Sequence, residues 1–548
     1  MSINKTLLLD IHAISLTRQG VSYFYWPIDP YEVGRVCTSM RRAIVAILRE
    51  AEEAQWSGVN AGVILKIHFV QEVMACYQAH LLISRTRRDG FFIKPAPKNR
   101  LIKAFLQAQS PLLPSFIHSL RGINNISSKW RLILRCVHDL MLGFRQGVPR
   151  LSLFSNDQDA RIVTLITTRL AKITAKELKK KILYQRPSRW FSCVDPQKVG
   201  TVNQYDTLIE HLLQMIQKEF SIAQLDFPEY IRHYLQTWLK ESIPLVEYHF
   251  SELSHQKNKI PKQLWANTQG NVWGSLLARY IKSRGGEVWR YTHTSGGGYY
   301  AHPVRQDVLE FEDCSTFVTV SDTQARLILE AFTGQDVVQR ECPQVVAMGN
   351  ENYFKHYAHT LNHSFRRTKK KTVMYVAPIY PGEFVYQATE GYMSDIVLLD
   401  WETRLIDHLQ QWNYPVLLKP HPVESQLIGS QPPESLTRLF GPIVRNELFE
   451  KIFHRADVVI LDNSATTLFT TLIMSNKPFV YIDFKVNALR QEARELLGRR
   501  CPIIKGQYDG DHRAYVEWES LHQAIEVSHT YHDRAFADTY FYTPAPAE

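Results

Sequence analysis

The sequence predicts an α/β protein of two Rossmann-like domains, because short apolar runs that end in polar clusters alternate with helical patterns in two separate parts of the chain. In the second part, the runs 416–418, 458–461 and 478–482 each stop at polar residues. Continuous apolar runs of this length suit strands that are buried on both faces of a parallel sheet. In the first part, strand and helix patterns alternate over 261–340. The basic stretch 351–371 between the two parts is predicted to be a linker.

Length and composition agree with two domains. The chain has 548 residues, more than one ordinary core organises, and its 45% hydrophobic and 22% charged residues are typical of globular proteins. We expect one domain at 1–350, a second at 372–510, and a terminal helix and tail at 511–548. No run approaches the ~20 apolar residues of a membrane-spanning helix. Seven widely spaced cysteines without a CxxC pair indicate a reducing, cytoplasmic compartment and argue against a zinc site.

The first domain is predicted to open with a strand at 5–11 and a long helix at 31–56, where apolar residues recur at helical spacing. A second strand is expected at 62–70, which is another apolar run. From 100 to about 256 the pattern is mostly helical, without the alternation of a strand. We therefore expect a helical insertion in the first domain over 100–256.

Strands return within 261–340, and their carboxyl ends carry polar and glycine-rich loops. The predicted strands at 264–265 and 288–291 each lead into such a loop. Glycine at a strand end lets the backbone approach a ligand closely. The loops lack the Gly-Lys-Ser/Thr of a Walker motif and the GxGxxG pattern of dinucleotide sites. The residues expected to line a cleft are Asn267, His293, Gly296, Gly297 and Gly298.

The second domain repeats the sequence of strand, helix and strand, as a doubly wound domain should. A strand over 373–377 is followed by Glu383, and a helical pattern covers 398–412. The next strand ends at Lys419, and a further strand ends at Asp462. In open parallel sheets, ligands bind just beyond the carboxyl ends of strands. These strand ends are therefore the expected place of the chemistry.

Two polar clusters in the second domain have the composition of a phosphate site. Ser464, Thr466 and Thr467 stand between a predicted strand and an apolar helix, where hydroxyl side chains cap the helix and leave its first N–H groups free for an anion. Lys419 and His421, at the end of what we expect to be the neighbouring strand, add donors and positive charge. Together the clusters could hold a nucleotide phosphate without a metal. The alternative is that Ser464 and Thr466 are only caps and that His421 only fills a turn.

The order of these clusters resembles the carboxyl-terminal half of GT-B glycosyltransferases. Lys-Pro-His-Pro at 419–422, followed by the Asp-Asn-Ser-Ala-Thr turn at 462–466, is most similar to enzymes that build bacterial surface carbohydrate from CMP- or CDP-activated donors. These include bacterial sialyl- and polysialyltransferases, Kdo transferases and CDP-glycerol polymerases. In such enzymes the HP histidine and the Ser/Thr turn contact the donor phosphate and nucleotide. The resemblance implies this role for His421, Pro422, Ser464, Thr466 and Thr467, with Lys419 beside them.

The resemblance implies transfer of a sugar, Kdo or a related nonulosonic acid, from a CMP donor to a growing capsule or lipopolysaccharide glycan. The sialyltransferase pattern fits less well, because the acidic D/E-D/E-G motif of those enzymes is missing from the strand ends. Transfer of a polyol phosphate from CDP-glycerol or CDP-ribitol stays open. A different class of alternative is a non-catalytic basic scaffold that binds anionic glycan or membrane. GT-B enzymes often return a terminal helix to the first domain, and 518–528 is the candidate.

Glycosyl transfer also needs a group that takes the acceptor proton or attacks as a nucleophile. His293 is the best-placed histidine, because it ends a predicted strand and opens the glycine loop. Glu383 follows a strand in the second domain, and Asp10 ends the first predicted strand. Each could instead be a structural loop residue. No DxD motif lies at a strand end, so neither a metal nor another cofactor is expected beyond the CMP-sugar donor.

The net charge of +10 and the pI near 9.0 favour anionic partners. We expect these to be the nucleotide-sugar donor, a glycan or lipid-linked acceptor, and the inner-membrane surface, contacted peripherally from the cytoplasm. Nucleic acid is not expected, because the sequence contains no recognisable nucleic-acid-binding module.

Overall fold

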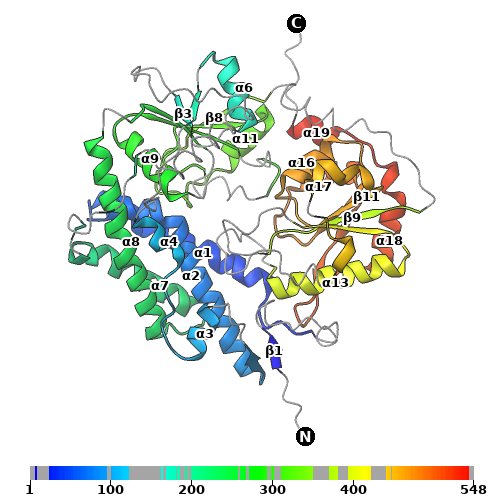
Figure 1. The fold of residues 1–548 in the computed structure, drawn as a ribbon, viewed down its shortest axis with the longest axis horizontal. Helices are drawn as coiled ribbons and strands as arrows, with labels where there is room; N and C mark the ends of the chain where they lie inside the picture. The colour runs from blue at the N-terminus through cyan, green and yellow to red at the C-terminus, as the bar shows by residue number, and fades with distance from the viewer. Residues whose placement is uncertain are drawn as a thin grey trace, which may run out of the picture.

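The computed structural model of the chain describes residues 6–8, 24–94, 100–121, 162–164, 168–180, 182–184, 190–191, 194, 199–200, 202–256, 260–266, 271–292, 298–301, 310–349, 370–380, 393–420, 440–445 and 447–541. Two parallel sheets with helices packed on them account for most of this part of the chain (Figure 1). The protein is therefore of the α/β class, in an arrangement compatible with two Rossmann-like domains. The predicted linker lies almost wholly outside the described residues.

The first sheet has six parallel strands in the order β4-β3-β5-β6-β7-β8. Its strands are β3 (Ile162–Thr164), β4 (Ile182–Tyr184), β5 (Gln263–Ala266), β6 (Glu287–Tyr291), β7 (Thr316–Thr319) and β8 (Gln344–Ala347). The strands predicted at 264–265 and 288–291 correspond to β5 and β6, so those two predictions are confirmed.

The second sheet has five parallel strands in the order β10-β9-β11-β12-β13. Its strands are β9 (Val373–Val376), β10 (Val416–Lys419), β11 (Val458–Leu461), β12 (Phe479–Asp483) and β13 (Ile503–Lys505). The predictions of β9 to β12 are confirmed, and every residue of β9, β11 and β12 is buried, as their continuous apolar runs require. In this strand order a ligand site is expected between β9 and β11, where the winding direction of the chain reverses.

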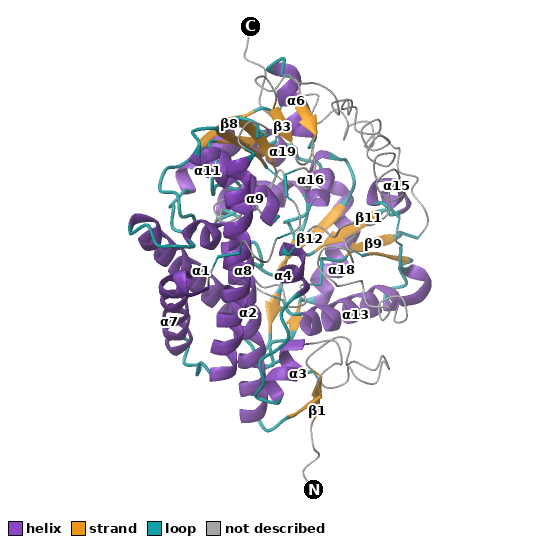
Figure 2. Cartoon of the chain, turned by 60° about the vertical axis from the view of Figure 1, so that its left-hand side comes forward, coloured by secondary structure: helices purple, strands orange, loops and turns teal. Residues whose placement is uncertain are grey.

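A bundle of long helices packs beside the first sheet, against α9 (Val272–Ser283) (Figure 2). Its helices are α1 (Pro30–Glu53), α2 (Val59–Arg88), α7 (Asp206–Ile222) and α8 (Glu229–His255), with the shorter α3 (Arg100–Leu106) and α4 (Ser115–Leu120) beside them. The helix predicted at 31–56 is confirmed by α1. By length and composition α2 could cross a membrane, but 78% of its most apolar stretch is buried inside the protein. That burial is typical of the core helix of a globular domain.

Two predictions for the first half are wrong. The strand expected at 62–70 lies inside α2, a helix of 30 residues that is buried on nearly all sides, so its apolar run resembled that of a buried strand. The helical insertion expected at 100–256 is interrupted by two strands, β3 and β4, which flank α6 (Arg169–Glu177). β3 and β4 are only three residues long, too short for an alternation to be recognised.

Two small sheets complete the strands of the described chain. The strand predicted at 5–11 is present as β1 (Thr6–Leu8), but it pairs with β2 (Phe92–Lys94) and stays outside the six-stranded sheet. The other small sheet is the antiparallel pair β14 (Gln507–Tyr508) and β15 (Ala514–Tyr515).

Polar residues that follow strands begin several of the helices. Asn271 Oδ1 accepts from the Trp273 N–H at 3.0 Å and starts α9, and Ser321 Oγ accepts from the Gln324 N–H at 3.2 Å and starts α11 (Asp322–Ala331). The helices of the second half are α13 (Asp395–Gln411), α15 (Phe449–Ile452), α16 (Thr467–Met474), α17 (Gln491–Arg500), α18 (Trp518–Val527) and α19 (Ala535–Tyr540). The helix predicted at 398–412 is confirmed by α13.

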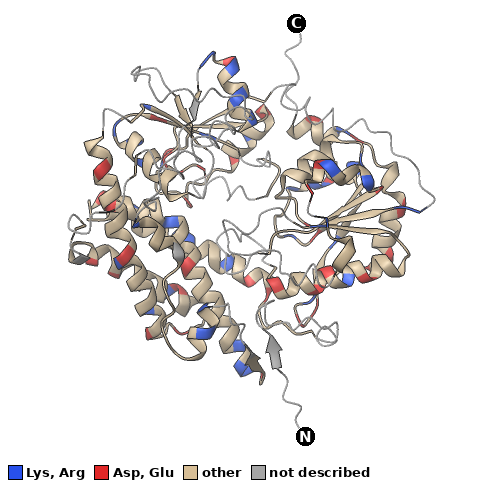
Figure 3. Cartoon of the chain, in the orientation of Figure 1, with Lys and Arg blue, Asp and Glu red and all other residues tan. Residues whose placement is uncertain are grey.

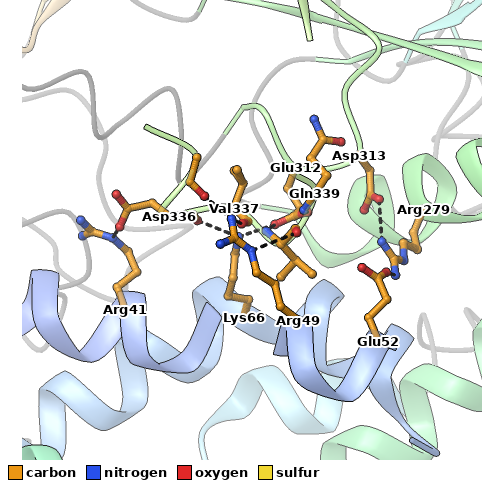
Figure 4. Close-up of polar contacts among 12 residues, drawn as sticks. Arg41, Arg49, Glu52, Lys66, Arg279, Glu312, Asp313, Asp336, Val337 and Gln339 are labelled. Atoms are coloured by element: carbon orange, nitrogen blue, oxygen red, sulfur yellow. Dashed lines mark hydrogen bonds and ion pairs between the residues drawn. The ribbon is translucent and has the colours of Figure 1, made fainter. Parts of the chain in front are cut away.

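Paired charges attach the helical bundle to the first sheet (Figure 4). Lys66 of α2 donates to Glu312 Oε2 at 2.5 Å and to the carbonyl oxygen of Asp336 at 3.1 Å. Arg41 of α1 donates to Asp336 Oδ1 at 2.7 Å. We call these four residues the polar seam. All four side chains are at most 2% exposed, so each charge is stabilised by its partners in the seam and not by water.

The polar seam lies at the amino-terminal edge of the first sheet, because Glu312 comes just before β7 and Asp336 comes before β8. Burial alone would raise the pKa of Glu312, but Lys66 and the backbone N–H of Val338, which donates at 2.7 Å, hold it below its ordinary value. The carboxylate therefore stays ionised. Its place at the edge opposite to the strand carboxyl ends indicates a structural role.

Replacing Lys66 with methionine should lower the free energy of unfolding by about 3–5 kcal/mol, because Glu312 would become a buried charge without a partner. Equilibrium unfolding in urea measures this. The matched control is Arg340→Met, which removes an ion pair with Glu53 whose side chains are 69% and 63% exposed. That change should cost less than about 1 kcal/mol. Equal and small effects of the two substitutions would contradict the structural role of the seam.

Candidate functional site

The carboxyl ends of the two sheets meet at a short backbone junction. Residues 299–301 pair with residues 488–490 through an antiparallel bridge between Tyr300 and Leu489. The first segment follows β6, and the second follows β12. Because all strands of each sheet run in the same direction, this contact brings both carboxyl edges to one interface. We call these two segments the junction.

Arg490 ties the junction together with three hydrogen bonds to the first half. Its backbone N–H donates to the carbonyl oxygen of Tyr299 at 3.0 Å. Its guanidinium donates from Nε to the carbonyl oxygen of Tyr300 and from Nη2 to that of Leu327 in α11, each at 3.2 Å. Leu327 belongs to the helix that follows β7, so one arginine contacts two of the loops and helices that begin at the carboxyl edge.

The end of the chain makes a second contact between the halves. Ser321, which follows β7, donates from its hydroxyl to the carbonyl oxygen of Tyr540 in α19 at 2.8 Å. The returning helix expected at 518–528 is therefore wrongly assigned. That segment is α18, which stays with the second half, where Trp518 stacks on Trp401 with ring centroids 5.6 Å apart. The helix that reaches the first half is α19, which is short and amphipathic and gave no distinct sequence signal.

The Ser/Thr turn after β11 is held in place by its own side chains. Asn463 Oδ1 accepts from the N–H of Ala465 at 2.8 Å and from Nδ2 of Asn487 at 3.3 Å. Asn487 lies just before the junction, so the turn and the junction are linked. Thr466 Oγ1 accepts from the N–H of Leu468 at 3.3 Å and caps α16, as predicted. The turn therefore stands at the point where the helix dipole favours an anion.

The three hydroxyl residues of the turn differ in exposure. Ser464 is 1% exposed, Thr466 is half-buried, and Thr467 is exposed. Ser464 Oγ lies beside the phenol of Tyr481 on β12, but it makes no hydrogen bond of normal geometry within the described part of the chain. A buried hydroxyl of this kind needs a further partner. A ligand phosphate could be that partner.

Lys419 is not as close to the turn as predicted. The expectation that β10 and β11 are neighbours is wrong, because β9 lies between them. Two strand spacings separate the ends of β10 and β11 by about 10 Å. Lys419 is 2% exposed, and its Nζ donates to the carbonyl oxygen of Pro420 at 2.7 Å. It remains at the same carboxyl edge as the turn.

Most of the other predicted site residues lie outside the described residues. They are Asn267, His293, Gly296, Gly297, Glu383, His421 and Pro422. Gly298 is described, and it has a φ of +90°. A Cβ atom there would lie 3.1 Å from Gln324 Cα, so the close approach of this segment to α11 requires glycine. Packing against α11 therefore explains why glycine is needed at position 298, which lies next to the junction.

A buried network of acids and phenols lies at the switch point between β9 and β11. Tyr375 OH donates to Asp462 Oδ2 at 2.6 Å, and Trp401 Nε1 donates to the same oxygen at 2.9 Å. Tyr380 OH donates to Glu402 Oε2 at 2.6 Å. Each of these five residues is at most 6% exposed. We call them the buried acid network.

Burial raises the pKa values of the two carboxyl groups in this network above those of ordinary acids. Burial raises the pKa of Asp462 to about 6, although the bonds from Tyr375 and Trp401 lower it. Burial also raises the pKa of Glu402 well above its ordinary value. Carboxyl groups with shifted pKa values at a strand edge are typical of functional sites. Asp462 could have been singled out because it ends a buried strand, whereas Glu402 follows a helical pattern and gave no signal.

No protein-family model matches the chain, and no curated protein matches it either. Within the described residues, no group of three or more His, Cys, Asp or Glu side chains could hold a metal ion. The functional assignment therefore depends on the fold, on the junction and on the side chains at the carboxyl edges.

The raised pKa of Asp462 predicts a pH dependence of stability. A carboxyl with a raised pKa costs stability once it is ionised, so the cost is absent below its ordinary pKa of 3.8, grows as the pH rises, and is complete above about 6. Asp462→Asn cannot ionise but can still accept a hydrogen bond. Relative to wild type, its free energy of unfolding should therefore rise by about 3 kcal/mol between pH 4 and pH 7, at 1.4 kcal/mol for each pKa unit.

Glu402→Gln provides a second measurement of the same kind. Because burial raises the pKa of Glu402 well above its ordinary value, the unfolded chain loses this proton at a lower pH than the folded chain does. The free energy of unfolding of Glu402→Gln relative to wild type should therefore also rise with pH above the ordinary pKa of a glutamate. A pH-independent difference for Asp462→Asn would show that Asp462 has an ordinary pKa.

Proposed function

We propose that the protein is a GT-B glycosyltransferase that moves a sugar, Kdo or a related nonulosonic acid, from a CMP-activated donor to a growing capsule or lipopolysaccharide glycan. One observation carries the proposal: the junction brings the carboxyl edges of two parallel sheets to the same interface. A transferase with a donor half and an acceptor half needs this arrangement, because the reacting groups must meet in a space that excludes water.

The Ser464–Thr467 turn supports the second half as the donor half. It lies at the switch point of a doubly wound sheet, where ligands of such sheets bind. The capped start of α16 favours an anion, and the buried Ser464 hydroxyl needs a partner. His421 and Lys419 follow β10 at the same edge and supply further donors in this proposal. The choice of cytidine and of a nonulosonic acid comes from the resemblance of the 419–422 and 462–466 motifs.

In this proposal, residues of the first half bind the acceptor and take up its proton. His293 precedes Gly298 by five residues, and Gly298 adjoins the junction. We assign His293 the role of general base toward the acceptor hydroxyl. Glu383 is the candidate for a carboxylate that attacks or stabilises the sugar from the donor half. Neither role needs a metal, and we propose metal-independent transfer.

The net positive charge of the chain supports an acceptor that lies at an anionic surface. Arg87 and Arg88 end α2 as exposed side chains, and the whole chain carries a net charge of +10. Lys and Arg residues are spread over the helices of both halves, among Asp and Glu residues (Figure 3). Basic residues near an anionic leaflet contribute about 1 kcal/mol each. We propose that the enzyme works in the cytoplasm on a lipid-linked or glycan acceptor, with peripheral contact to the inner membrane and no role for nucleic acid.

A nucleotide screen tests the donor assignment. Thermal unfolding of the full chain with CMP, CDP, UDP and GDP should show stabilisation by the cytidine nucleotides, by about 2.7 kcal/mol at one hundred times Kd. Preference for CDP over CMP would favour a polyol-phosphate transferase instead. Binding of UDP or GDP alone would contradict the cytidine assignment. Binding of polyanions only, abolished by salt, would indicate a non-catalytic scaffold.

Two substitutions test the proposed phosphate contacts. His421→Ala and Ser464→Ala should each lower kcat/KM for the CMP-sugar by about 10- to 150-fold, because hydrogen bonds to charged groups contribute about 1.5–3 kcal/mol. Ser254→Ala is the control, since that exposed hydroxyl donates only to the carbonyl oxygen of Ser251 at 2.6 Å. Unchanged kcat/KM in both site variants would refute the phosphate site.

A further inference from the structure

Asp462 is an unusual neighbour for a phosphate site. It directly precedes the Ser/Thr turn, it is 6% exposed, and it lies at the switch point between β9 and β11. Its Oδ2 accepts hydrogen bonds from Tyr375 and from Trp401, and the backbone N–H of Asp462 also acts on the carboxylate. Its Oδ1 is fully buried and accepts no hydrogen bond from another described residue. Asp462 Oδ1 and Ser464 Oγ are thus two buried polar atoms beside the turn that make no hydrogen bond of normal geometry to another described side chain.

The groups around Asp462 do not offset a negative charge. Those that face it are Tyr375 on β9, Tyr380 after β9, Glu402 on α13, Tyr481 on β12 and Tyr508 on β14, with Asp395 of α13 acting on Glu402 and Tyr380. All of them are phenols or carboxyl groups. The cation Arg494 acts on Tyr481, but it pairs with Asp483. A phosphate bound at the turn would therefore add a like charge to an ionised Asp462, and like charges in a buried site cannot both stay ionised cheaply.

We propose that the site takes up a proton at Asp462 Oδ1 when an anion binds at the Ser464–Thr467 turn, so that the neutral carboxyl no longer repels the anion. This inference rests on the phosphate site of the proposed function. The proton comes from solvent, the carboxylate becomes a carboxylic acid, and no other bond changes. Binding and protonation then strengthen each other, because each favours the same state of the site.

The geometry assigns the proton to Oδ1. The indole N–H of Trp401 can only donate, so Oδ2 must act as an acceptor and cannot carry the proton at the same time in this arrangement. Tyr375 donates to the same oxygen. Oδ1 is the oxygen that neither of these two donors occupies, so it is the one that can take the proton. The raised pKa of Asp462, about 6, places its protonation within reach at neutral pH.

Calorimetric titration of the full chain with CMP and with pyrophosphate tests the inference. At pH 7.5, titration in two buffers of different ionisation enthalpy should show uptake of up to about one proton per bound ligand in the wild type. The wild-type Kd should weaken by up to about tenfold between pH 7 and pH 8. In Asp462→Asn the part of the uptake that comes from Asp462 should disappear. The difference between the two proteins, measured with the same ligand, separates it from proton exchange by the ligand phosphates.

Glu402→Gln is the matched control, because it changes another buried acid of the same network and leaves Asp462 in place. It should keep the proton uptake of the wild type. If Asp462→Asn does not fold, the wild-type titration still decides the point, since binding of pyrophosphate or CMP without proton uptake at pH 7.5 overturns the inference. Equal uptake in wild type and Asp462→Asn overturns it as well.

The two ligands separate this inference from the proposed function. Pyrophosphate binding with proton uptake, without CMP binding, supports the coupled anion site and contradicts the nucleotide assignment. CMP binding with no uptake supports the donor site and contradicts the coupling. Binding of neither ligand overturns both.

Discussion

The junction between residues 299–301 and 488–490 is the constraint on which the proposed site depends. A parallel sheet presents ligand-binding loops at its carboxyl edge, so two sheets can share one site only if those edges face each other. The bonds that achieve this use backbone groups and the guanidinium of Arg490. No carboxyl group takes part in these bonds.

The polar seam and the buried acid network are both buried, but they differ in how their charges are satisfied. In the seam, Lys66 faces Glu312 and Arg41 faces Asp336, so each charge has an opposite partner. In the network, Asp462 and Glu402 face phenols and an indole, and no opposite charge contacts Asp462 through the bonds described above. The seam stabilises the fold at the amino edge of the first sheet. The network stores an unfavourable charge at the switch point of the second sheet, which is where function, rather than stability, explains such a cost.

Most of the longer strands were predictable from the sequence. β9, β11 and β12 are apolar runs in which every residue is buried, and β5, β6 and β10 alternate with helical patterns and lead into polar residues. The short strands β3 and β4 were not predictable, because three residues are too few to show the alternation of a strand. The run at 62–70 was wrongly predicted as a strand, because α2 is buried on nearly all sides and its apolar run resembles that of a buried strand. The hydroxyl cap at Thr466 was predictable from its place between strand and helix. The order of strands within a sheet cannot be read from the sequence, so the distance between Lys419 and the turn was misjudged. Glu402 became visible only once the fold placed it against Tyr380.

The most direct test of a site shared by both halves is hydrogen exchange of the full chain with and without CMP. If the carboxyl edges enclose the donor, CMP should slow the exchange of amides in 462–468 and also in 298–301, whose elements meet at the junction. Amides in 310–314 and 336–339, which flank the polar seam at the other edge, should be unchanged. Protection confined to one half, or protection at the seam and not at the Ser/Thr turn, would contradict the shared site.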